Sequence, residues 1–171
     1  MNKSFFLTFM ACCTLLSCRS DEDSIQKIDQ IMNFYIQDAN GKDLLRPGQI
    51  GSFTTITLND NLAATDVAPI SFSPKMTTDS IFYQEYIAGA TRQLVNGSDA
   101  NSENRQYRSD VRVALTKKLT DSTFSEIDND TLQIFYNWTP SIFEVSKVLY
   151  NNNEVQVTKD SENRNIVKIT K

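Results

Sequence analysis

Residues 132–158 read LQIFYNWTPSIFEVSKVLYNNNEVQVT, and this stretch decides the fold class. Leu132, Ile134, Tyr136 and Trp138 stand at alternate positions, and β-branched and aromatic residues are frequent throughout. Side chains of a strand point alternately to its two faces, so this spacing is typical of a strand with one buried face. The stretch therefore predicts β-structure in which Tyr136 and Trp138 face the core.

The last third of the chain continues this pattern as three short runs separated by turn residues. Asparagine tolerates positive φ, so the run at 151–153 suits a tight hairpin turn, and the polar segment 159–163 suits a second turn. In the first run the alternation slips at Ser146 and Lys147, which predicts a β-bulge. We expect a three-stranded antiparallel meander over 142–150, 154–158 and 164–170.

Upstream segments have the same period of two. The clearest apolar sets are Met32, Phe34 and Ile36; Thr54, Ile56 and Leu58; and Val111, Val113 and Leu115. Residues 81–95 fit either a hairpin broken near Gly89 or a short helix, and their aromatic content favours strands. Pro69 and Pro74 restrict the segment between them to a short edge strand, and residues 96–109 are polar enough to form a long exposed loop.

Together these segments predict seven to nine short strands and no long helix. We expect one all-β domain over residues 31–171, folded as an antiparallel β-sandwich. An immunoglobulin-like arrangement is one form of such a sandwich, although its Cys…Trp…Cys hallmark is absent.

The N-terminus has the pattern of a secretory signal. Lys3 precedes an uncharged apolar run over 5–16, which is shorter than the roughly 20 residues that a membrane-spanning helix needs. The run ends in Leu15-Leu16-Ser17-Cys18, which resembles the lipoprotein box of bacteria. The resemblance implies cleavage after Ser17, removal of residues 1–17, and lipid such as palmitate on Cys18. An ordinary signal peptide cut nearby is the alternative.

The residues after the cysteine resemble a second targeting signal. Ser20, Asp21, Glu22 and Asp23 resemble the export signal of Bacteroidetes lipoproteins, which implies an outer-membrane protein that faces the cell exterior. A solvated acidic linker is the alternative. Residues 18–30 have little to bury, so we expect a lipidated tether with some helical turn at 25–31.

Composition excludes several classes of function. The formal charge is −4 and there is no basic cluster, which argues against nucleic acid as a partner and leaves lipid as the means of membrane attachment. The chain contains no histidine, so Ser-His-Asp catalysis and histidine-ligated zinc are excluded. The sequence indicates no cofactor and no catalytic residue. Glu126, Asp128 and Asp130 could be imagined as glycosidase carboxylates, but three acids in one polar turn do not form a pair across a cleft.

Residues 38–43 place oxygen-bearing side chains around a glycine. Asp38, Asn40 and Asp43 could therefore be calcium ligands, whereas the Asn40-Gly41 pair also suits a plain β-turn, which we favour. Continued to Pro47, the segment resembles the opening of small Bacteroidetes lipoproteins. This resemblance implies a cell-surface location and an all-β domain, and it implies no activity.

Two further sets of residues are candidates for contact or modification. Four matches resemble the Bacteroidetes O-glycosylation pattern of Asp, then Ser or Thr, then a hydrophobic residue; their acceptors are Ser24, Ser80, Ser122 and Thr131. Turn residues at strand entries are the alternative. Of the aromatic residues Tyr83, Tyr86, Phe135, Tyr136 and Trp138, we expect Phe135 to face outward, because it alternates with Gln133 and Asn137.

These observations favour a surface lipoprotein whose domain binds an extracellular glycan or a partner protein. The alternative is a structural or adhesin-like component whose sheet edges pair with another chain. A carboxylate-dependent hydrolase is the third and weakest interpretation.

Overall fold

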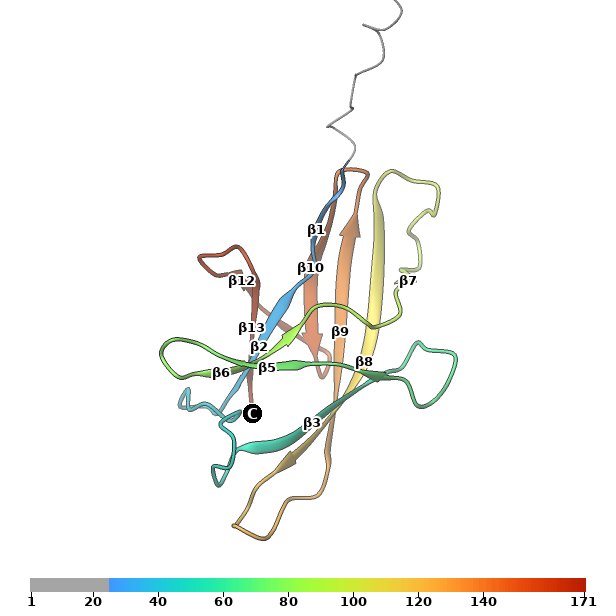
Figure 1. The fold of residues 1–171 in the computed structure, drawn as a ribbon. Helices are drawn as coiled ribbons and strands as arrows, with labels where there is room; N and C mark the ends of the chain where they lie inside the picture. Colours follow the sequence, from blue (N-terminus) through green and yellow to red (C-terminus); the bar gives the residue numbers. More distant parts are fainter. Residues whose placement is uncertain (1–24) are drawn as a thin grey trace, which may run out of the picture.

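Every regular element in the described part of the chain is a β-strand. A computed structural model describes residues 25–171, which form thirteen strands (Figure 1). The expected lipoprotein box, Cys18, the acidic signal at 20–23 and Ser24 lie outside these residues. No helix with the length and apolarity of a membrane span occurs within 25–171. The prediction of an all-β chain is confirmed.

The strands form two sheets. The large sheet has the order β1-β10-β9-β8-β3-β4, with β11 paired to β10 and β7 paired to β8. Its strands are β1 Lys27–Asp29, β3 Phe53–Asp60, β4 Pro69–Ile70, β7 Gln93–Leu94, β8 Arg105–Lys117, β9 Asp128–Trp138, β10 Ile142–Tyr150 and β11 Asn153–Val155. The small sheet has the order β12-β13-β2-β6-β5, built from β2 Met32–Gln37, β5 Ser73–Met76, β6 Phe82–Tyr86, β12 Val157–Lys159 and β13 Asn165–Thr170.

One hydrophobic core lies between the sheets. Ile134 and Tyr136 of β9 are fully buried in it, together with Val167 of β13 and Met32 of β2. Trp138 packs against the same core. The alternation in residues 132–138 therefore predicted the buried face correctly.

Both sheets are mixed, which corrects the antiparallel expectation. β1 runs parallel to β10, and β2 runs parallel to β13, while the other pairs are antiparallel. The parallel pairs join the first strands of the described chain to its last ones. No short turn links such distant segments, so local sequence could not set their relative direction.

The expected C-terminal meander is wrong in one respect. Both hairpin turns form, with Asn151 and Asn152 at positive φ, and the β-bulge lies between Val145 and Lys147 as predicted. However, the middle segment is divided at Gln156: β11 pairs with β10 in the large sheet, and β12 pairs with β13 in the small sheet. Val155 and Val157 both pack against the shared core, so alternation continues unbroken across the change of sheet.

Three other expectations need correction. Residues 27–29 form β1, not a helical turn, so part of the expected tether at 18–30 belongs to the large sheet. The polar segment 96–109 is a loop only to residue 104, because β8 begins at Arg105. Phe53 is buried where Thr54 was expected, because a register shift between Phe53 and Thr55 changes the phase of β3.

Candidate binding groove between the sheets

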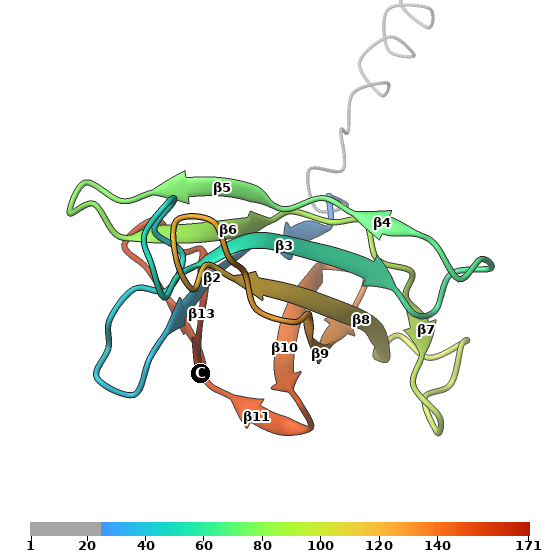
Figure 2. The same cartoon turned by 90° about the horizontal axis from the view of Figure 1, so that it is seen from below.

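The clearest concave site lies where the chain crosses from the large sheet to the small one. β4 ends at Ile70, and the chain passes through Ser71 and Phe72 into β5 of the other sheet. Figure 2 shows β4 and β5 following one another along one side of the molecule. The expected short strand between Pro69 and Pro74 is thus two edge strands, one in each sheet.

The early departure of β4 leaves most of β3 without a neighbour on that side. β4 pairs only with Leu58 and Asn59. Within residues 25–171 no strand pairs with the 54–57 segment of β3 on the side opposite β8. The Asp60 N–H donates to the Ala68 carbonyl at 2.9 Å, on the β4 side. By alternation the N–H and C=O of Ile56 face the same side, so they lie at the open edge.

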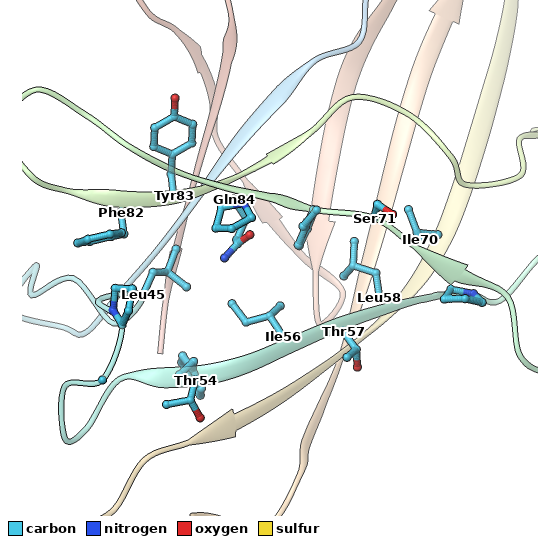
Figure 3. Close-up of a pocket in the computed structure, with 16 residues that line it drawn as sticks. Leu45, Thr54, Ile56, Thr57, Leu58, Ile70, Ser71, Phe82, Tyr83 and Gln84 are labelled. Carbon is cyan, nitrogen blue, oxygen red and sulfur yellow. The ribbon is translucent and has the colours of Figure 1, made fainter. Parts of the chain in front are cut away.

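A groove of about 540 Å³ lies beside this open edge. Figure 3 shows Ile56 and Leu58 of β3 on one wall, with Phe82 and Gln84 of β6 and Leu45 on the facing side, while Tyr83 points away. The complete lining is Leu45, Pro47, Gly48, Phe53, Thr54, Ile56, Thr57, Leu58, Pro69, Ile70, Ser71, Phe72, Pro74, Phe82, Tyr83 and Gln84. The side chains that project into the groove are mainly apolar. Ile56, Phe72 and Phe82 are partly exposed there, whereas Phe53, Leu58 and Ile70 are buried beneath them.

Asp43 fixes one wall of the groove. Its Oδ1 accepts the Leu45 N–H at 2.7 Å and its Oδ2 accepts the Phe82 N–H at 3.0 Å, so one carboxylate joins the loop after β2 to the start of β6. Asp38 caps the preceding turn, since its Oδ1 accepts the N–H groups of Asn40 and Lys42. These hydrogen bonds support the β-turn interpretation of residues 38–43 and occupy oxygens that the calcium hypothesis required.

Asp60 and Gly89 fix the opposite end. The buried Asp60 carboxylate accepts the N–H groups of Thr91 at 2.7 Å and Leu62 at 2.9 Å. Burial raises the pKa of Asp60, but the hydrogen bonds from Thr91 and Leu62 outweigh burial and hold the pKa below its ordinary value. Gly89 has φ +133°, and a Cβ there would lie 3.1 Å from Cγ2 of Ile70. Glycine is therefore needed to seat Ile70 in the groove wall.

On the other side of the molecule, acidic residues meet the C-terminal lysine. The buried Asp130 carboxylate accepts hydrogen bonds from the Tyr150 hydroxyl and the Lys171 ammonium, and from Asn151 Nδ2 at 2.6 Å. Lys171 also pairs with Asp128 at 2.6 Å. Burial raises the pKa of Asp130, but these donors outweigh it and lower the pKa. Asp128 and Asp130 thus converge on an ammonium group, while Glu126 is exposed.

The remaining predicted residues lie apart from the groove. Ser80 and Ser122 are exposed in turns, Ser80 with φ +60°, whereas Thr131 lies within β9 rather than at its entry. Phe135 lies on the outer face of the large sheet, where the Lys147 ammonium stands 4.5 Å from its ring centre. Tyr83 stacks on Tyr35 at 5.2 Å on the outer face of the small sheet.

The groove could not be predicted from the sequence. Its apolar residues have the alternation of ordinary core strands, so nothing in the pattern marks Ile56 or Phe82 as partly exposed. The available signal was the pair Pro69 and Pro74, which limits how far an edge strand can extend.

Comparisons of the chain with known protein families, with curated proteins and with solved structures find no match.

Proposed function

We propose that this chain is a lipid-anchored surface protein that binds an extended segment of a partner protein by strand addition to β3. One observation carries the proposal: an unpaired strand edge borders a groove into which apolar side chains such as Ile56 and Phe82 project. An added strand satisfies free backbone N–H and C=O groups, while its alternate side chains enter the pockets below. The partner is therefore a segment with apolar residues at every second position and no proline among them.

The shape of the two sheets supports this occupant over a small ligand. We propose that the fold is a β-sandwich, with an immunoglobulin-like arrangement as one form of it, in which no strand covers residues 54–57 beyond β4. A strand that continued the line of β4 along 54–57 would cover the exposed sides of Ile56 and Phe82. Exposed edges of this kind are usually protected in monomeric proteins. Pro74 protects β5 by removing one N–H donor, whereas the Thr-rich segment of β3 contains no proline.

The surface location rests on the sequence. The lipoprotein box at 15–18 and the acidic residues 20–23 support attachment through Cys18 to the outer membrane, facing the exterior. Labelling of the native host with an alkyne fatty acid should mark the wild-type protein and not the Cys18→Ser variant. Equal labelling of both proteins would rule out lipid at Cys18.

Peptide selection tests the groove directly. Protein purified in detergent from the native host is offered a display library of random ten-residue peptides. The selected peptides should alternate apolar and polar residues, and their binding should slow hydrogen exchange at the Ile56 amide. Peptides without this period, or protection confined to another strand, would contradict the proposal.

A pair of adjacent substitutions provides the matched control. Ile56→Lys places an ammonium group in the groove, whereas Thr55→Lys adds the same charge to the opposite face of β3, outside the groove lining. Ile56→Lys should weaken peptide binding at least about tenfold, which corresponds to roughly 1.4 kcal/mol. Thr55→Lys should change peptide affinity less than about twofold. Similar affinities for the two variants would show that peptides bind elsewhere.

A further inference from the structure

A second concave site lies at the end of the large sheet where β1 enters. A pocket of about 730 Å³ is formed by the loop 95–104 and by the adjoining ends of β8, β9 and β10. In Figure 1 this loop lies beside β7 and the start of β8, at the end of the molecule where β1 begins. The volume is in the range of sites for small ligands.

The floor of this pocket is a row of planar polar side chains. Gln106 pairs with Asn137 across β8 and β9, and Asn137 pairs with Glu144 across β9 and β10. Tyr136, the neighbour of Asn137 in the strand, is fully buried in the core, so the row projects from the outer face. Gln106 Nε2 donates to Asn137 Oδ1 at 3.3 Å, which orients both amides.

Several hydrogen-bonding groups of the row remain available. Asn137 keeps its Nδ2 donors and Gln106 keeps its Oε1 acceptor, since their mutual bond uses the other atoms. The Glu144 carboxylate has no ion-pair partner among residues 25–171. Donors and acceptors thus alternate along a row that crosses three strands, about 10 Å in length, and that includes the Glu144 carboxylate.

An aromatic ring continues the outer face beyond this row. Arg105 and Trp138 border the pocket from the core-facing side of the sheet, where the guanidinium stacks 4.1 Å from the ring centre. One step further along the outer face, the next row across the sheet consists of Arg108, Phe135 and Lys147. Phe135 therefore extends the pocket floor along β9, away from the loop.

We infer that this pocket binds a neutral carbohydrate. Its terminal sugar occupies the pocket, and the sugars that follow pass over Phe135. Neighbouring sugar hydroxyls act as both donors and acceptors, which matches paired amide and carboxylate groups. The C–H faces of a sugar ring are apolar and pack on aromatic rings. The carboxylates of Asp99 and Glu144 alternate with the cations of Arg105, Arg108 and Lys147, so the site has no strong excess of either charge and suits a neutral ligand.

Glycan-array binding with full-length protein from the native host tests the inference. An array of neutral oligosaccharides should give hits that titrate to saturation. Asn137→Ala should weaken a hit at least about tenfold, because it removes the middle of the row. Gln133→Ala is the matched control: it is an amide on the same face of the same strand but outside the pocket, and should change affinity less than about twofold.

The outcomes separate this site from the groove. Ile56→Lys should leave glycan affinity unchanged, and Asn137→Ala should leave peptide affinity unchanged. Equal effects of Asn137→Ala and Gln133→Ala, no hit among neutral glycans, or hits only among anionic ones would overturn the inference. Matching thermal unfolding of the variants, measured by circular dichroism, would show that loss of binding is not loss of folding.

Discussion

On each of two sides of the molecule the chain crosses from the large sheet to the small one, but only one crossing borders a groove lined mainly by apolar side chains. On one side the chain changes sheets between β4 and β5 through Ser71 and Phe72, and on the other between β11 and β12 through Gln156. We call these the open side and the closed side. Figure 2 shows β4 and β5 along one side and β11 near the C-terminus on the other.

The difference lies in what fills the gap beside each crossing. On the closed side Lys171 and Tyr150 meet the buried Asp130 carboxylate, and the pocket beside this crossing, about 420 Å³, is lined largely by polar residues. On the open side no charged cluster bridges the sheets among the lining residues, and inward-facing apolar side chains border a larger groove. A change of sheet alone therefore does not create a binding groove. The groove forms where the crossing is left without a polar bridge or a covering strand.

The largest expected effect comes from breaking the closed side. Asp130→Ala removes a buried carboxylate and leaves Tyr150 and Lys171 without their shared acceptor, so it should lower the free energy of unfolding by about 3–5 kcal/mol. Asp128→Ala is the control, because the Asp128 side chain is 52 % exposed and should lose no more than about 1 kcal/mol. Urea denaturation measures both, and equal losses would refute a bridging role for Asp130.

Truncating one isoleucine on each side sharpens the comparison. Ile169 of β13 is 4 % exposed in the core, so Ile169→Ala should cost about 3 kcal/mol. Ile56 is partly exposed in the groove, and Ile56→Ala should cost only about 1 kcal/mol. Equal costs in urea denaturation would mean that the groove wall is as well packed as the core.

Acid should weaken the bridge of the closed side through Asp130. The pKa of Asp130 is lowered in the folded protein, so its contribution to stability is fully present above its unfolded pKa and is lost as the pH falls through the folded one. Urea unfolding of the wild type should therefore require less denaturant below about pH 4. The Asp130→Asn variant should show a shallower acid dependence, and an identical pH profile for both proteins would contradict this assignment.

The smallest expected effect concerns the hairpin turns beside the two crossings. Ser80 has φ +60° in the β5–β6 turn, and Asn152 has φ +64° in the β10–β11 turn. Serine tolerates this conformation less well than asparagine, so Ser80→Gly should stabilise the protein by about 0.5 kcal/mol. Asn152→Gly should change stability by less than about 0.3 kcal/mol. Thermal unfolding compares them, and a larger gain from Asn152→Gly would reverse the interpretation.

Sequence alone determined which face of each clear strand is buried. The spacing of Leu132, Ile134 and Tyr136 predicted their burial, and the slip at Ser146 predicted the β-bulge, because side-chain direction depends only on local backbone geometry. The same rule placed Phe135 on the outer face. The proposed lipidation signal at Cys18 is also visible in the sequence, because such a signal is a continuous stretch of residues.

Only the tertiary structure decided which sheet each strand joins. Both sheets bury their inner faces in one core, so a strand can cross from one to the other at Ser71 or Gln156 without disturbing its alternation. For the same reason Ile56 looks like any core residue in the sequence. Whether the groove beside Ile56 is covered depends on how far β4 extends along β3. The local sequence pattern does not specify which strands pair or over what length.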